Sequence, residues 1–321
     1  MKNTNSHYLL RKLIAMVLAL WCTGVLAQTR IGGLLFSGEA RYAEALTGFK
    51  DTLHKAGYTE ANTYFVIENA QANKAKAVEL VKKLSSDKLD LIFTVGTSAT
   101  AAVSRTIVDV PVVFSVVYDP VVAGIAKSWT SSDNNTTGVS SQLPMSQLMD
   151  VLKRLVPVKK LAVLYTPGEK NSEAALADLQ KIQDAYQIKV VPVRLTSAEE
   201  DQHLLPTVLQ VVDAVYVTGS NLVDSQVALI SDLAAKAKIP TITHLEDLVE
   251  RGVLMGVCAD SYTQGQDAGA KAIKILKGAK PASLPIDKPK TSMTLLNMQT
   301  AKKGNFAIPD DFMKTVTKKI E

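Results

Sequence analysis

Residues 89–100 read LDLIFTVGTSAT, an apolar run that stops at a glycine and continues with small residues. The run from Leu89 to Val95 predicts a buried β-strand, because strands covered on both faces are continuously apolar. Gly96 permits a tight turn, and a helix that begins at Thr97 leaves its first backbone N–H groups unpaired. The segment therefore predicts a strand–turn–helix unit with hydrogen-bonding groups at the carboxyl end of the strand.

The same alternation of strand and helix continues in both directions along the chain. Apolar, β-branched runs predict further strands at 30–36, 63–68, 112–117, 161–166, 189–193, 214–218, 241–243 and 253–258. Helical spacing predicts helices at 73–86, 171–185, 222–237 and 262–277. We therefore predict the α/β class, with parallel sheets that are covered on both faces.

These strands are too many for one compact open sheet, and the polar, turn-rich segment 131–138 offers a division. We expect two doubly wound parallel-sheet lobes joined by a hinge. Three prolines within 281–289 predict an extended linker, and 297–321 predicts a short strand followed by one or two helices.

The first 27 residues form a separate segment. Three basic residues and no acidic one accompany an uncharged stretch that is shorter than the ~20 apolar residues a membrane span needs. We interpret 1–27 as a secretory signal peptide that is cleaved after Ala27, with an uncleaved anchor or a buried helix as the alternatives. Lipidation at Cys22 is not expected, because the bulky Trp21 precedes it.

Removal of this segment changes what the composition implies. The formal charge of +5 falls to +2, because three basic and no acidic residues leave. The remaining basic residues are scattered over helices without interleaved aromatics, so no nucleic acid is expected as a partner. Only Cys258 remains, so no intrachain disulfide forms. We expect a soluble exported protein that does not insert directly into the membrane.

The candidate binding residues follow the strands, where ligands of open parallel sheets bind. Thr97, Ser98 and Ala99 begin a helix whose unpaired N–H groups and positive dipole end suit a carboxylate or another anion. Helix capping explains the same hydroxyl groups without any ligand.

Five other residues at strand ends are candidates. Tyr118 is available to stack on a flat ligand, or packs against the sheet. Asp119 is a partner for a ligand ammonium, or forms a turn with the proline after it. Asn171 and Asn221 reach toward the ligand from the second lobe, or cap helices, and Asp260 faces the cleft or lies in a hinge turn.

The sequence lacks the common catalytic patterns. GTSAT at 96–100 misses the final glycine of a nucleophile elbow, and neither a phosphate-binding loop nor a His-Glu-x-x-His motif occurs. No Cys/His spacing fits a metal site. We therefore expect no enzyme, no metal and no cofactor. An exported hydrolase would need His244, at a strand end, to bond a serine and a carboxylate.

Residues 110–125, VPVVFSVVYDPVVAGI, followed by NTTGVS at 135–140, resemble the bacterial ABC-transporter substrate-binding proteins of the tryptophan/tyrosine type (TrpX-like). Supporting stretches lie at 48–58, 89–97, 161–172, 275–281 and 297–302. The resemblance implies a type I periplasmic-binding-protein fold with two lobes, three crossing segments and a ligand in the cleft. Members linked to aromatic amino acids tend to carry His-Pro after the first strand, where this chain has SGEA at 37–40.

The resemblance also implies an organisation and a set of roles. The first lobe would comprise 28–139 plus 261–280, and the second 140–260 plus 290–321. First-lobe contacts would be Thr97, Ser98 and Asp119, and second-lobe or hinge contacts Asn171, Asn221 and Asp260.

We expect a monomeric, periplasmic solute-binding protein that captures a small polar ligand by hinge closure and serves an ABC permease. An amino acid is the leading ligand hypothesis, with aromatic amino acids first. A periplasmic ligand sensor for a receptor and an exported α/β hydrolase-like enzyme are the alternatives.

Overall fold

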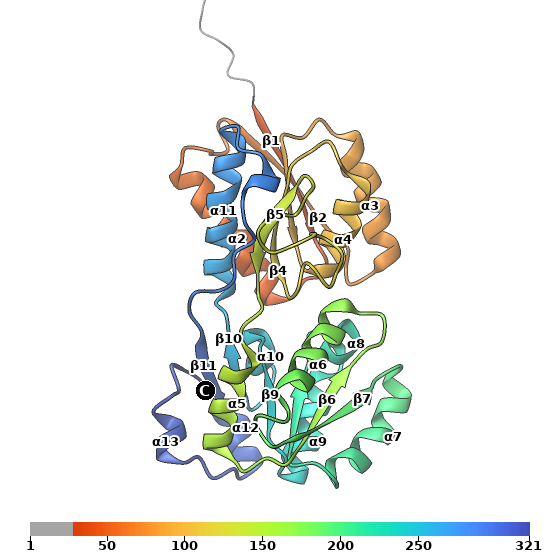
Figure 1. The fold of residues 1–321 in the computed structure, drawn as a ribbon, viewed down its shortest axis with the longest axis vertical. Helices are drawn as coiled ribbons and strands as arrows, with labels where there is room; N and C mark the ends of the chain where they lie inside the picture. The colour runs from red at the N-terminus through yellow and green to blue at the C-terminus, as the bar shows by residue number, and fades with distance from the viewer. Residues whose placement is uncertain (1–27) are drawn as a thin grey trace, which may run out of the picture.

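The structure, a computed structural model, describes residues 28–321, so the expected signal peptide lies outside the described residues. It consists of two α/β lobes stacked end to end (Figure 1). The sheet of the first lobe is fully parallel, in the order β2–β1–β3–β4–β5. Its strands are β1 (Thr29–Leu35), β2 (Thr63–Asn69), β3 (Leu91–Val95), β4 (Val112–Val117) and β5 (Thr136–Ser140). Its helices are α2 (Ala40–Lys55), α3 (Lys74–Ser86), α4 (Thr97–Thr106) and α11 (Ser261–Leu276).

The sheet of the second lobe has the order β12–β11–β10–β9–β8–β6–β7, and only the β10–β11 pair is antiparallel among the pairs of this described sheet. Its strands are β6 (Lys160–Tyr165), β7 (Lys189–Arg194), β8 (Ala214–Val217), β9 (Thr241–Thr243), β10 (Met255–Cys258), β11 (Met293–Asn297) and β12 (Lys318–Ile320). Its helices are α5 (Met145–Leu155), α6 (Lys170–Ile182), α7 (Ala198–Leu209), α8 (Asn221–Ser225), α9 (Val227–Ala237), α10 (Glu246–Glu250), α12 (Met298–Lys303) and α13 (Asp310–Met313).

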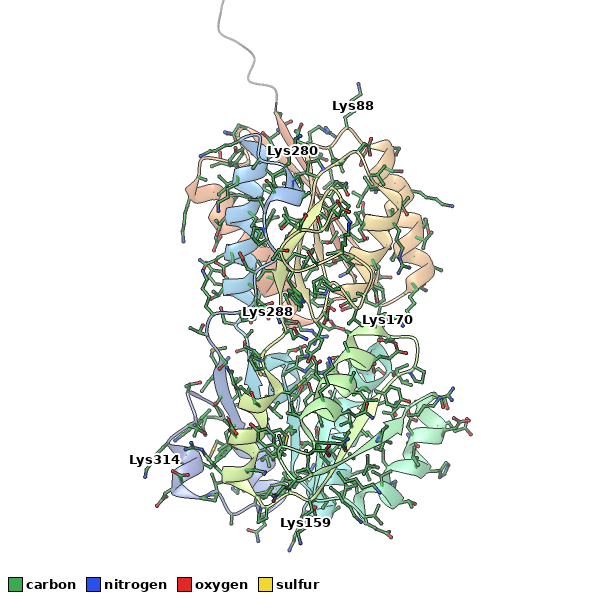
Figure 2. The ribbon with its side chains drawn as sticks, viewed as in Figure 1. Lys88, Lys159, Lys170, Lys280, Lys288 and Lys314 are labelled. Atoms are coloured by element: carbon green, nitrogen blue, oxygen red, sulfur yellow. The ribbon has the colours of Figure 1, made fainter. Side chains whose placement is uncertain are left out.

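The chain passes between the lobes three times: after β5, between β10 and α11, and before β11 (Figure 1). A short 3₁₀ turn, η1 (Pro281–Ser283), precedes the third crossing. Asp287 then forms a bridge with Val139, so the first and third crossings run side by side. Lys288, which Figure 2 labels, belongs to the third crossing. Its ammonium lies 4.1 Å from the ring centre of Trp129. Two of the three crossing segments therefore lie next to each other where they connect the lobes.

The predicted α/β class is confirmed, and most predicted strands end within two residues of the observed ones. β5 was missed, because its sequence, TTGVS, looks like part of the polar segment before it. Its five residues are nevertheless all buried, and a Cβ at Gly138 would lie 2.4 Å from the carbonyl oxygen of Phe114. The predicted helix at 222–237 is two helices, which divide at Gln226. The strand expected at the start of 297–321 is β11, which lies earlier and ends at Asn297, and two helices follow it as expected. β12 was also missed, and it is short and largely exposed.

Helix α11 follows most of the second lobe in sequence, and its close packing against α2 makes it part of the first lobe. A Cβ at Gly265 would lie 2.0 Å from the Ala45 carbonyl oxygen, and one at Gly48 would lie 2.1 Å from that of Tyr262. Only glycine permits so close an approach of two backbones. Beneath this pair, the rings of Phe49 and Phe93 stack at 3.9 Å in the core of the lobe.

Within residues 28–321, no helix combines the length and apolarity that crossing a membrane requires. Basic side chains are distributed over both lobes. In Figure 2, Lys88 and Lys280 lie at the outer end of the first lobe, Lys159 and Lys314 toward the outer part of the second, and Lys170 near the middle.

We predict that Gly265→Ala lowers the free energy of unfolding by about 1–3 kcal/mol, because the added methyl group forces α2 and α11 apart. Thermal unfolding measures the loss. Ala270→Ser, on the exposed side of the same helix, is the control and should leave Tm nearly unchanged. Equal Tm values for the two variants would show that the helices tolerate a wider separation.

Candidate ligand-binding site

The carboxyl ends of strands from both sheets meet at the boundary between the lobes, around a cavity of about 20 Å³. This volume holds about one water molecule, so the lobes are closed upon each other. The residues around it are Arg41, Tyr42, Thr97, Val116, Tyr118 and Ser141 from the first lobe and first crossing, and Asn171, Gly219, His244 and Leu245 from the second lobe. We call this space the central cavity.

The start of α4 contributes hydrogen-bond donors to this cavity. Gly96 has a φ of 92°, and a Cβ there would lie 2.6 Å from the Tyr42 hydroxyl, so glycine is required at this turn. Thr97 is 9% exposed, and no protein group within residues 28–321 hydrogen-bonds its hydroxyl. The first N–H groups of a helix also lack acceptors within the helix. The α4 start therefore offers unpaired donors at the positive end of a helix dipole.

A strained bulge shapes the end of β4. Val116 has a φ of 55°, which is rare for a β-branched residue, and the pairing with β5 shifts register between Phe114 and Val117. A bulge bends a strand and redirects the side chains that follow it. Strain of this kind persists only where the surrounding structure imposes it, and it is common at binding sites.

Tyr118 follows the bulge and is almost fully buried. Its hydroxyl donates a hydrogen bond of 3.1 Å to Asp178, and its ring meets the His244 ring edge to face at 5.1 Å. Burial, together with the neighbouring Tyr216 and Asp178, raises the pKa of Tyr118, so the phenol stays protonated. Tyr118 thus presents a neutral aromatic surface at the boundary of the lobes.

His244 lies on the second-lobe side of the central cavity, directly after β9, and it is also buried. Burial, assisted by the positive charge of Arg41 and opposed by Asp247, lowers the pKa of His244 to about 3. Its Nδ1 is 2.5 Å from the hydroxyl of Tyr216. The serine and carboxylate partners that a hydrolase would need at this histidine are not found among the hydrogen bonds of residues 28–321.

An ion cluster crosses the boundary of the lobes beside the central cavity. Arg41, in the first turn of α2, contacts Glu39 of its own lobe at 2.7 Å. Its other terminal nitrogen lies 2.5 Å from Asp247 and 3.6 Å from Asp224, both in the second lobe. Burial opposes the charge of Arg41, but Asp247 and Glu39 outweigh it and raise the pKa of the guanidinium. Burial raises the pKa of Glu39, with Arg41 partly offsetting it.

Three of the predicted residues, Thr97, Tyr118 and Asn171, line the central cavity. Ser98 borders a neighbouring cavity of about 360 Å³, and Ala99 is buried within α4. Asn221 lines a third cavity, of about 520 Å³, where its backbone and side-chain N–H groups bond Glu169.

The structure assigns local roles to the two predicted carboxylates. Asp119 accepts hydrogen bonds of 2.9 Å from the backbone N–H groups of Val121 and Val122, which is the turn alternative. Asp260 caps α11 through the N–H of Thr263. Neither residue lines the central cavity.

Sequence reasoning missed several residues of the cavity, among them Arg41, Tyr42, Val116 and Ser141. An arginine in a first helical turn resembles a solvated residue, and the bulge at Val116 leaves no mark in an apolar run. Gly219 and His244 were recognisable as residues within two positions of the ends of β8 and β9.

Two α/β lobes that meet around the central cavity and its two larger neighbours, with three chain crossings between them, are typical of a binding protein that encloses its ligand by hinge motion. The family model described as ABC transporter substrate binding protein matches residues 34–320, and the chain belongs to this family. The predicted family, fold class and function as a solute-binding protein are therefore confirmed, and the hydrolase alternative finds no support.

Several relatives share most of the chain. The tyrosine-binding protein of Clostridioides difficile (strain R20291) is 28% identical over 261 residues, which are 81% of this chain and 76% of that protein. The ABC domain from Streptococcus pneumonia in complex with L-Trp is 25% identical, with a TM-score of 0.86 over 92% of this chain and 100% of that one. The ligand-free, open structure of a substrate binding protein with adhesive properties from Clostridium difficile is 26% identical, with a TM-score of 0.73 over 90% and 98%.

Membership of this family has general consequences. Its proteins act outside the cytoplasm, bind small-molecule ligands and deliver them to ABC permeases. They are binding proteins, and their family role is not catalytic.

We predict that Arg41→Met opens the ligand-free protein. The variant leaves Glu39, Asp224 and Asp247 facing one another, and a buried charge that loses its partner costs about 3–5 kcal/mol unless the lobes separate and water returns. Small-angle X-ray scattering should show a larger radius of gyration. Arg251→Met is the control, because Arg251 pairs only with Asp224 of its own lobe among the described ion pairs. An unchanged radius for Arg41→Met would contradict the prediction.

We also predict an acid-sensitive stability that depends on His244. The native pKa of about 3 lies below the ~6.5 of an unfolded histidine, so this stabilisation is complete above pH 6.5 and is lost as the pH falls toward 3. The free energy of unfolding should fall by at most about 1.4 kcal/mol per pH unit in this window. Denaturant titrations of the wild type and His244→Gln measure the slope, which should be shallower in the variant.

Proposed function

We propose that this protein binds an L-amino acid, with aromatic ones preferred, in the central cavity and delivers it to an ABC permease. The single observation that carries the proposal is the α4 start, where Thr97 lines the cavity between the lobes and its hydroxyl, which is open to that cavity, lacks a partner within residues 28–321. A ligand carboxylate supplies the acceptors that these groups lack. The relatives named for tyrosine and crystallised with L-Trp support the choice of an aromatic amino acid.

The rest of the cavity complements such a ligand. Tyr42, Tyr118 and His244 provide aromatic edges and faces against which a flat side chain can pack. Asn171 donates its Nδ2–H to the carbonyl of Gly219 at 2.7 Å, which leaves its Oδ1 available to a ligand ammonium. We favour Asn171 over Asp119 for this role, because the Asp119 carboxylate already accepts two backbone N–H groups.

The ligand enters when the lobes separate, because about 20 Å³ is too small for an amino acid. Hinge closure over the ligand then creates the surface that the permease recognises. We further propose that the protein is a periplasmic monomer released by cleavage after Ala27, with lobes 28–139 plus 261–280 and 140–260 plus 290–321.

We predict that L-tyrosine and L-tryptophan raise the Tm of the mature protein, because a ligand that binds only the folded state stabilises it. A thermal-shift screen of all amino acids tests the ligand class. A shift with another solute class and none with any amino acid would contradict the proposal.

We predict that Thr97→Val, which keeps the shape and removes the hydroxyl, weakens amino-acid binding about tenfold or more, since a hydrogen bond to a charged group contributes ~1.5–3 kcal/mol. Isothermal titration calorimetry measures the affinity. Thr47→Val, at an exposed position of α2, is the matched control and should bind as the wild type does. Wild-type affinity in Thr97→Val would remove the α4 start from the site.

A further inference from the structure

The ring of His244 is fixed between two tyrosines. It stacks on Tyr216 with a centroid distance of 5.8 Å and an interplanar angle of 10°, and it meets Tyr118 edge to face. Tyr216 belongs to β8, is 0% exposed and lies in the core of the second lobe. The imidazole therefore has one orientation, with one edge in the core and the other at the central cavity.

The bond between Tyr216 and His244 determines the tautomer. The Tyr216 hydroxyl has His244 Nδ1 as its single hydrogen-bond partner within residues 28–321. If Nδ1 carried the hydrogen, the phenol hydrogen would be buried without an acceptor, which costs about 1–3 kcal/mol. If the phenol donates, both hydrogens have suitable places, because Nδ1 accepts and the imidazole hydrogen moves to Nε2. The Nε2–H tautomer is therefore the stable one.

The other ring nitrogen has no protein partner. Among the hydrogen bonds of residues 28–321, none involves His244 Nε2, although the residue is 7% exposed and lines the cavity. The charged groups that act on the ring are Arg41 and Asp247, and the neighbouring Tyr118 and Tyr216 remain neutral. Nε2 is not among the enclosed polar atoms of these residues that lack a partner, so it is open to the central cavity and available to a ligand.

We infer that His244 is a specificity-determining residue, which donates a hydrogen bond from Nε2–H to an oxygen acceptor of the ligand. This inference rests on the proposed function, because it places the ligand in the central cavity. The acceptor is a carboxylate, carbonyl or hydroxyl oxygen. A ligand ammonium is excluded from this position, because it would meet an N–H donor and the nearby guanidinium of Arg41.

Nitrogen NMR of the imidazole tests the donor without any ligand. In ligand-free protein labelled with ¹⁵N-histidine, we expect His244 to be the neutral Nε2–H tautomer from pH 7 to pH 5. Tyr216→Phe removes the hydroxyl that donates to Nδ1 and should shift the population toward the Nδ1–H tautomer. A predominant Nδ1–H tautomer or an imidazolium ion in the wild type would overturn the inference.

Binding of L-tyrosine and L-tryptophan to two variants tests the contact. Glutamine places an amide N–H near the position of Nε2, so His244→Gln should bind within about threefold of the wild type. His244→Leu, which retains bulk without a donor, should bind at least tenfold more weakly. Equal losses in both variants, with Tm values alike, would reduce His244 to a packing residue and overturn the inference.

The two experiments separate this inference from the proposed function. If neither amino acid binds the wild-type protein, the proposed function fails, whereas the NMR result still upholds or overturns the donor at Nε2.

Discussion

The guanidinium of Arg41 is the charge on which the closed arrangement of the lobes depends. It reaches from α2 of the first lobe to two carboxylates of the second, in a position that water scarcely reaches. Burial of charges costs several kcal/mol per ion, and their attraction offsets this cost only when the geometry is good. The free energy of closure therefore includes a small difference between the cost of burying these charges and the attraction between them. A ligand that adds contacts on both sides of the central cavity shifts such a balance by its differential affinity for the closed form.

The general architecture was predictable because it follows from periodicity. Buried parallel strands are predominantly apolar, so β3 and β4 stand out against the helices between them. β5 was not predictable from its own residues. Its threonines and glycine are typical of turns, and the strand forms because the backbone of β4 and the third crossing cover it. Tertiary packing overrides local preference there.

In the candidate site, too, some residues could be predicted from the local sequence, whereas the positions of others depend on distant parts of the chain. The placement of Thr97, Tyr118 and Asn171 at the cavity follows from the rule that ligands bind beyond the carboxyl ends of parallel strands. The involvement of Arg41 depends on how one lobe faces the other, and the strain at Val116 depends on the register between two strands. Asp119 and Asp260 satisfied the same rule, but local backbone N–H groups compete for their carboxylates. The residue types at strand ends therefore predict where the binding site lies. The three-dimensional arrangement determines which of these residues line it.

The threaded path of the chain has a consequence for assembly. α11 completes the first lobe, yet it follows almost all of the second lobe in sequence, and β11 and β12 complete the second lobe only afterwards. The glycine contacts between α2 and α11 join residues that are separated by more than half of the chain. Neither lobe can reach its full core until the carboxyl-terminal quarter has emerged. The two lobes therefore complete their folding together and late, since each one depends on a segment from the carboxyl-terminal quarter of the chain.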